Sequence, residues 1–258
     1  MPVQATSEHS TGIENCEGVR LLRALRHLNH ILPLKHRQAS LQPPLVMIHR
    51  SILRSLAERG RPLKRAEIAG MLGNELSALN ALAVLGSNDL IVLNSAVTKD
   101  PVTRRVIIQD PAAVEVVGAY PMTTAETPHK VTLFGHEIFA MCALDGLSIA
   151  PMFNTDTRIE SKCHVTGEPI KIHQKGMELL EASPSVEVRF GIRWQKIAGS
   201  AAHGICKEMV FLKDQETARS WKSTDPDAIE TFNLAEAIEF GAAFFTPLLE
   251  DGEPAPLL

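Results

Sequence analysis

The chain has 258 residues, which is enough for one large domain or two small ones. Hydrophobic residues make up 45% of it and charged residues 22%, the ordinary composition of a soluble globular protein. No apolar run approaches the roughly 18 residues that a membrane span needs. The first 20 residues also lack an apolar core flanked by basic residues, so we expect a cytoplasmic protein without a secretory signal.

Charge is unevenly distributed along the chain, although the net charge is only −4. Residues 18–65 contain eleven Lys or Arg and one acidic residue, Glu58, whereas residues 214–253 contain ten Asp or Glu and two basic residues. A basic front with an acidic tail indicates either nucleic-acid binding or two halves of the protein that attract each other.

The front half of the chain is predicted to be mainly helical. Residues 1 to about 17 are polar and aperiodic, which predicts disorder. Apolar residues then recur at helical spacing in four stretches, 19–32, 45–56, 64–72 and 76–85. Short strands at 90–93 and 105–108 follow, with turn residues between them. The last three of these helices, followed by a hairpin, are in the order typical of a winged helix-turn-helix. This shape does not by itself imply DNA binding.

The second half of the chain is predicted to be α+β, with a mixed or antiparallel sheet. Its patterns indicate a helix that starts near His136, a hairpin around Thr166-Gly167-Glu168, a half-buried strand at 186–194, a strand at 205–212 and a last helix at 234–245. We therefore divide the chain into an N-terminal extension that is partly disordered (1–42), a winged-helix-like domain (43–119), a linker (120–129) and a C-terminal domain (130–258).

The four cysteines are Cys16, Cys142, Cys163 and Cys206. Without a secretory signal, reduced thiols are favoured over disulfides. The chain has no CxxC pair, which removes the strongest signals of a zinc site or a thioredoxin-like site.

Cys142 and Asp145 are the first candidate functional pair. Positions three apart lie on one face of a helix, so the thiol and the carboxylate can converge. Packing alone does not readily explain a carboxylate beside a thiol in an apolar stretch. Two structural alternatives remain open, because buried cysteine is common and Asp145 could be a turn residue before Gly146.

Cys163 and Cys206 lie in strand-like segments. His164 follows Cys163, but adjacent strand residues point to opposite faces, so a structural role for Cys163 is favoured over a shared metal site. Cys206 can be a small buried residue. Lys207 could favour its thiolate, but on a strand that side chain would point the other way.

The stretch from Phe139 to Gly167 contains Cys-Ala-Leu-Asp and, further on, Cys-His-Val-Thr-Gly. It is similar to the core of the organomercurial (alkylmercury) lyases, which have Cys-Ala-Leu-Asp and Cys-x-x-Thr-Gly motifs at the same interval. That family has a further cysteine on a strand, ahead of an apolar pair and a Thr-Ala…Trp segment. The matching residues here are Cys206, Phe211-Leu212, Thr217-Ala218 and Trp221. The resemblance covers roughly residues 45–245 and is specific in the second half.

The resemblance implies a carbon–mercury lyase whose catalytic and mercury-binding residues are Cys142, Asp145 and Cys206, with Cys163 structural and Cys16 dispensable. Soft thiolates would bind mercury, and the Asp145 carboxylic acid would protonate the carbon. The products would be a hydrocarbon and transiently bound Hg(II). No cofactor is implied. The implied partners are the organomercurial substrate, cellular thiols that remove the ion, and a mercuric reductase that accepts it.

The chain departs from the family pattern in three places. Met141 stands where an aromatic residue commonly precedes the first cysteine, Lys207 stands where the family has a second cysteine, and the segment 95–120 is longer. The alternatives are a winged-helix DNA-binding regulator or thiol-based metal sensor, an inactive relative, and a zinc protein using the cysteines Cys142, Cys163 and Cys206 with a histidine. Binding to nucleic acid is not expected, because the second helix of the turn has no basic residue. Binding to membranes is not expected either, because the chain has no long apolar run.

Overall fold

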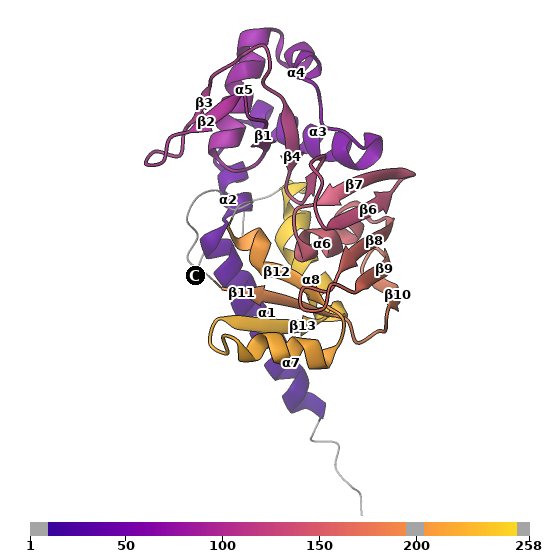
Figure 1. The fold of residues 1–258 in the computed structure, drawn as a ribbon. Helices are drawn as coiled ribbons and strands as arrows, with labels where there is room; N and C mark the ends of the chain where they lie inside the picture. The colour runs from indigo at the N-terminus through magenta and orange to yellow at the C-terminus, as the bar shows by residue number, and fades with distance from the viewer. Residues whose placement is uncertain (1–9, 195–203, 252–258) are drawn as a thin grey trace, which may run out of the picture.

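The computed structural model describes residues 10–194 and 204–251 and has an α+β fold (Figure 1). Its front half is mainly helical, and its second half combines sheets with helices. The α-helices are α1 (Ser10–Ile31), α2 (Leu34–Ala39), α3 (Pro43–Arg59), α4 (Arg65–Leu72), α5 (Glu75–Ser87), α6 (Ala143–Phe153), α7 (Gln215–Ser223) and α8 (Leu234–Phe245). Two short 3-10 helices are η2 (Ile205–Glu208) and η3 (Thr246–Leu248).

The strands form three sheets in which every pairing is antiparallel. The largest sheet has the order β1-β4-β5-β7-β6-β8-β9-β10, the second has the order β12-β11-β13, and β2 pairs with β3. The strands are β1 (Val92–Leu93), β2 (Val97–Lys99), β3 (Val106–Ile108), β4 (Val116–Ala119), β5 (Met122–Thr123), β6 (His129–Leu133), β7 (His136–Ala140), β8 (Asp156–Lys162), β9 (Pro169–Lys175), β10 (Glu178–Ser183), β11 (Arg189–Arg193), β12 (Met209–Leu212) and β13 (Ile229–Asn233).

Local signals account for the boundaries of the front helices. α3 begins at Pro43, because proline suits the first turn of a helix, and it ends at Arg59, because the next residue, Gly60, adopts the left-handed conformation with φ 64°. The side chain of Asn74 accepts a hydrogen bond from the Ser77 N–H and so caps α5. α4 and α5 are inclined to each other by 110°, and the hairpin β2–β3 follows them.

Two predictions for the front half need correction. The polar residues before Val19 are not all outside regular structure, because α1 begins at Ser10; residues 1–9 lie outside the described part of the chain. A helix gains a backbone hydrogen bond for each residue that extends it, so a polar segment can continue a helix held by its apolar face. The segment 120–129 is also more than a linker. It contains β5 and buries Tyr120 and Met122, and it joins β4 to β7 within one sheet.

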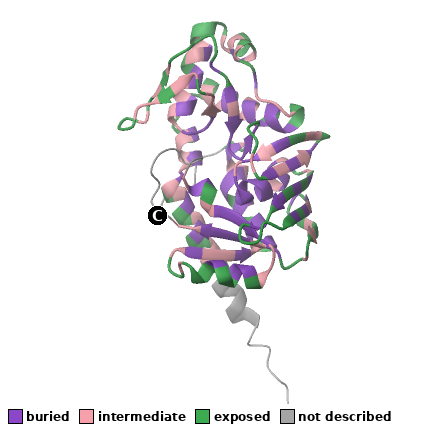
Figure 2. Cartoon of the chain, in the orientation of Figure 1, coloured by how far each residue is buried: buried purple, intermediate pink, exposed green. Residues whose placement is uncertain are grey.

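α6 is the central element of the second half. It packs on β6, β7, β8 and β9 of the large sheet, and its other side contacts α8 and β12. Buried residues gather where α6 and α8 meet the sheets (Figure 2). The small sheet packs closely on α7. A Cβ at Gly191 of β11 would lie 2.5 Å from the Trp221 ring, so this position requires glycine.

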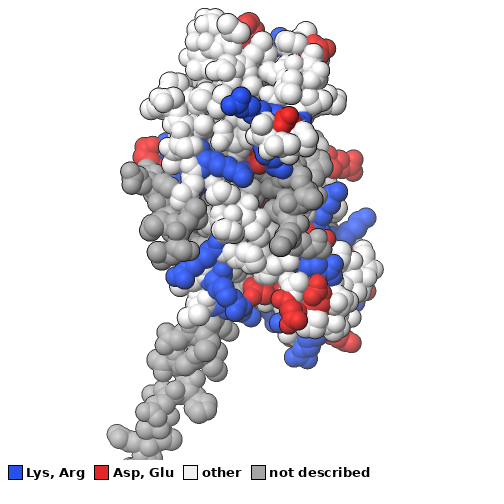
Figure 3. All heavy atoms as spheres, turned by 90° about the vertical axis from the view of Figure 1, so that its left-hand side faces the viewer, with Lys and Arg blue, Asp and Glu red and all other residues white. Residues whose placement is uncertain are grey.

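The basic front of the chain is paired with its acidic tail. α1 and α3 form salt bridges with the C-terminal region through the pairs Arg20–Glu236, Arg23–Glu230 and Arg50–Asp251. Arg20 also lies over the Phe232 ring. On the face shown in Figure 3, basic and acidic side chains are interspersed. These pairs support the interpretation that the two halves attract each other.

Within residues 10–194 and 204–251, no single helix is both long enough and apolar enough to cross a membrane. α4 and α5 taken together meet the criteria of length and composition, but they are strongly bent relative to each other.

Candidate active site

Cys142 lies at the junction of β7 and α6. The predicted helix starting near His136 is wrong at its start, because residues 136–140 form a strand that pairs with β6 and β5. Cys142 is therefore the N-cap of α6, with extended backbone angles of φ −154° and ψ 179°. Its side chain is fully buried. This position directs the thiol toward the free N–H groups of the first turn of the helix.

Asp145 belongs to the first turn of α6. Its backbone N–H donates a hydrogen bond to the Cys142 sulfur at 3.4 Å, so the three-residue spacing brings the two residues together through a cap. Asp145 is only 2% exposed. One carboxyl oxygen, Oδ2, is buried without a hydrogen-bond partner among the described residues. An unpartnered carboxyl oxygen in an apolar surrounding favours the neutral acid.

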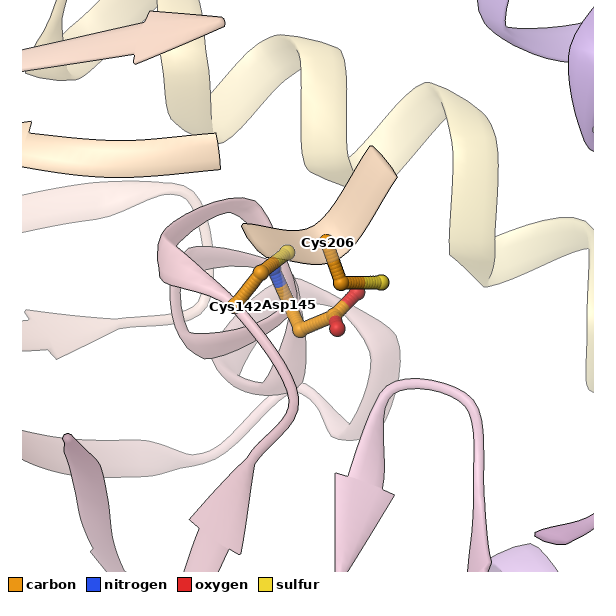
Figure 4. A group of neighbouring side chains, drawn as sticks. All are labelled: Cys142, Asp145 and Cys206. Carbon is orange, nitrogen blue, oxygen red and sulfur yellow. The ribbon is translucent and has the colours of Figure 1, made fainter. Parts of the chain in front are cut away.

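Cys206 reaches the same place from 64 residues further along the chain. It lies in the 3-10 helix η2 rather than on the predicted strand, and β12 begins only at Met209. The ligand atoms of Cys142, Asp145 and Cys206 all lie within 4.8 Å of one another. Figure 4 shows the Cys206 side chain extending beside the Asp145 carboxyl group. The structure thus brings the three predicted residues into one buried group.

The surroundings hold all three groups in their protonated forms. Burial raises the pKa of Asp145 from 3.8 to about 8. Burial, the neighbouring Cys206 thiol and the charge of Asp145 raise the pKa of Cys142 well above its usual value. The interaction with Cys142 lowers the pKa of Cys206, but burial and the charge of Asp145 raise it by more. At neutral pH the resting site therefore carries two thiols and a carboxylic acid.

This shift predicts how stability depends on pH. The unfolded Asp145 carboxyl loses its proton near pH 4, whereas the folded one keeps it until about pH 8. The stabilisation of the folded state by the proton on Asp145 is therefore fully present below pH 4 and is lost as pH rises to 8. We expect the free energy of unfolding of the wild type to fall between pH 5 and 8.5 relative to that of Asp145→Asn. Denaturant titrations of both proteins measure this difference, and parallel profiles would contradict the assignment.

Cys163 lies apart from this group, at the turn between β8 and β9. Its backbone N–H donates to the Glu168 carbonyl at 2.8 Å, and its carbonyl accepts from the Gly167 N–H at 2.8 Å. Burial raises the pKa of the Cys163 thiol, but hydrogen bonds from Thr166 and from the Lys213 backbone lower it by more. Among the described residues, the metal-binding group contains neither Cys163 nor a histidine, which contradicts the predicted four-residue zinc alternative.

Cys163→Ser should lower thermal stability, because a buried thiol that accepts several hydrogen bonds is replaced by a hydroxyl with shorter bonds and a different hydrogen-bonding geometry. A loss of about 1–3 kcal/mol is expected for disturbing a buried hydrogen-bonded group. Thermal unfolding of the variant measures it. The matched control is Cys16→Ser, whose side chain lies outside the described residues and whose hydrocarbon release should equal that of the wild type. Loss of activity in Cys16→Ser would contradict the predicted division of the chain.

The sequence did not single out Met209. Its sulfur lies 3.5 Å from the Cys142 sulfur, which donates its S–H hydrogen toward it, and the residue is 3% exposed. A methionine three residues after a cysteine in an apolar segment has the pattern of an ordinary core residue, so no sequence signal distinguishes it.

Two thiols and a carboxylic acid in one buried site form a group that could hold a soft metal ion and has a proton to deliver beside it. The family model of alkylmercury lyase (MerB) matches residues 122–246, the segment that contains all three groups. The predicted resemblance is thereby confirmed for this segment, which is similar to the alkylmercury lyases.

Curated relatives support the same assignment. The chain is 30% identical to the alkylmercury lyases of Bacillus cereus and Clostridium butyricum over 134 residues, which are 52% of this chain and 60% of each relative. It is 28% identical to the alkylmercury lyase of Pseudomonas putida over 132 residues, which are 51% of this chain and 61% of that protein. The matched part thus spans about three fifths of these relatives.

The fold is similar to a solved structure, the mercury-bound form of MerB2. The TM-score is 0.62, the identity is 22%, and the match covers 84% of this chain and 98% of that one. At this identity the likeness concerns the fold, and it extends into the front half of the chain, beyond the segment that the family model matches.

Proposed function

We propose that the protein is an organomercurial lyase, which cleaves carbon–mercury bonds by protonolysis to give a hydrocarbon and Hg(II). One observation carries this proposal: Cys142, Asp145 and Cys206 place their ligand atoms within 4.8 Å of one another in a buried site of the segment that is similar to the alkylmercury lyases. Metal–sulfur bonds are about 2.3 Å for zinc, so one ion between two sulfurs spans about 4.6 Å, close to the 4.8 Å within which these ligand atoms lie.

The reaction begins with capture of the organomercurial, written R–Hg–X, where X is the ligand it carries. One enzyme thiol replaces X on mercury, and its proton leaves with X as HX. The second thiol coordinates the same mercury as a neutral sulfur donor, and the thiolate and this thiol together place electron density on the carbon bound to mercury. When Asp145 passes its proton to that carbon, the second thiol gives its own proton to the carboxylate and becomes the second thiolate on Hg(II).

Asp145 supplies the proton that breaks the carbon–mercury bond. Its raised pKa of about 8 keeps it protonated at neutral pH, so the acid is ready beside the mercury. The electron pair of the C–Hg bond takes this proton, and R–H leaves. The sum is R–Hg–X plus two thiols giving R–H, HX and Hg(II) held by two thiolates, with every atom and charge balanced and no change in oxidation state.

Release of the bound Hg(II) requires an external thiol, and we propose that cellular thiols remove the ion and that a mercuric reductase accepts it. We propose that the reaction needs no cofactor, because proton transfer and ligand exchange use only groups of the chain. A site made of free thiols requires a compartment that keeps thiols reduced, and on this ground we propose a cytoplasmic location.

We also propose that residues 43–119 form a winged-helix-like unit. The inclination of 110° between α4 and α5 and the β2–β3 hairpin support it. DNA binding is not favoured, because α5 has no basic residue and three arginines of α1 and α3 pair with the acidic tail, namely Arg20, Arg23 and Arg50. A salt-dependent affinity for duplex DNA would reverse this view.

The direct test incubates the purified protein with phenylmercury and excess thiol and assays benzene in the headspace. We expect benzene to form in catalytic amounts, with Hg(II) accumulating as its thiol complex. Cys142→Ser serves as the inactive control. If the wild type forms no more benzene than this control, the proposed function is wrong.

A further inference from the structure

Met209 is fixed beside both cysteines by the backbone around it. Its N–H donates to the Cys206 carbonyl, which closes the 3-10 turn of η2. Side chains three residues apart on a 3-10 helix are eclipsed, so Cys206 and Met209 lie on the same side of the turn. Met209 also starts β12, where it pairs with Ile192 of β11. Turn and strand together hold its side chain toward α6.

The contact between Met209 and Cys142 is made sulfur to sulfur. The thioether sulfur of Met209 lies 3.5 Å from the Cys142 thiol and accepts its hydrogen. A leucine would fill a similar volume without offering a donor atom. A thioether is a soft ligand of the same chemical kind as the thiolates, and it is neutral at every pH.

We propose that Met209 is a third sulfur donor to the captured mercury, next to Cys142 and Cys206. In the resting site its lone pair accepts the Cys142 S–H hydrogen. When the Cys142 thiol loses its proton and its sulfur binds mercury, the Met209 sulfur no longer accepts a hydrogen bond. Its lone pair then faces the metal. The thioether then donates to mercury without adding charge, and no bond in Met209 is broken. This inference rests on the proposed function for its substrate and concerns this chain's own residue.

Retention of mercury is the property that this donor controls. Two thiolates leave mercury open to attack by an incoming external thiol, and a third sulfur occupies part of that open coordination space. Met209 therefore slows or weakens removal of Hg(II) by thiols until the hydrocarbon has left. We therefore expect loss of the Met209 sulfur to change metal retention more than bond cleavage.

The test compares Met209→Leu with wild type and with a matched control, Met152→Leu. Met152 is 5% exposed and lies near the far end of α6, roughly 15 Å along the helix from Cys142 at about 1.5 Å per residue. Each protein is loaded with one equivalent of a Hg(II) salt and titrated with glutathione. We expect half-removal from Met209→Leu at a roughly tenfold lower glutathione concentration, the scale seen when a supporting partner of a metal ligand is lost. Equal retention in all three proteins would overturn the proposal.

A second measurement does not depend on the folding of a variant. Wild-type protein labelled with selenomethionine and loaded with Hg(II) should show selenium at bonding distance from mercury in the X-ray absorption spectrum. A mercury shell that contains sulfur but no selenium would overturn the proposal. The loading step needs no bond cleavage, so a protein that binds Hg(II) through selenium yet releases no benzene from phenylmercury would contradict only the proposed lyase function. A protein that binds no Hg(II) would contradict both.

Discussion

Replacing Asp145 by asparagine should leave mercury capture intact and lower the rate of hydrocarbon release by about 10²–10⁴-fold, the usual value of general acid catalysis. Capture survives because both soft thiol ligands remain. Cleavage fails because an amide of nearly the same shape has no acidic proton to give to the carbon. The experiment is a single-turnover assay with phenylmercury, in which benzene and protein-bound mercury are both quantified.

Asp156→Asn is the matched control for this variant. Asp156 begins β8 and is exposed, with its carboxylate bound to His173 at 2.9 Å, so the same chemical change is made away from the site. Its single-turnover rate should equal that of the wild type. Normal benzene release from Asp145→Asn would remove Asp145 from the mechanism and leave the two cysteines as a simple mercury-binding pair.

Replacing Cys206 by serine should weaken both mercury retention and cleavage. The hydroxyl is a hard oxygen donor that cannot replace a soft thiolate on mercury. We expect retention to fall by more than the roughly 10–100-fold seen when only an outer partner of a metal ligand is removed, because here a direct ligand is lost. Cleavage should fall with it, since a single thiolate places less electron density on the carbon.

Gel filtration in the presence of a competing thiol, followed by mercury analysis of the protein fraction, measures retention in Cys206→Ser. Cys163→Ser is the control, because it makes the same exchange at a cysteine outside the site and should retain mercury at a temperature where it is folded. If Cys206→Ser retained mercury as well as the wild type did, Cys206 would not be a ligand.

Several elements of the fold and one contact of the site could be predicted from local sequence. Helical spacing predicted α3, α4 and α5, and strict alternation predicted the region of β11. The three-residue spacing of Cys142 and Asp145 also predicted their proximity, although the observed geometry is a cap and first turn rather than two positions inside a helix. Both arrangements bring positions i and i+3 together, so the contact did not depend on the exact start of the helix.

Other features depend on tertiary packing that local patterns do not encode. The approach of Cys206 to Cys142 could be predicted only through the family motifs, because β12 must first pair with β11 and then pack on α6. The 3-10 turn at Cys206 was not predicted, since an apolar segment of this length is equally typical of a strand. The Met209 contact follows from that turn and was missed with it.

Protonation of the carbon by the buried acid is tested most directly by a single turnover of phenylmercury in D2O without external thiol. We expect one benzene per protein, carrying one deuterium, with one Hg(II) retained and two thiols lost to titration. The deuterium reports protonation of the carbon by an exchangeable acid, and the lost thiols report capture by Cys142 and Cys206. Benzene without deuterium, or release of benzene with both thiols still titratable, would contradict protonolysis by these three residues.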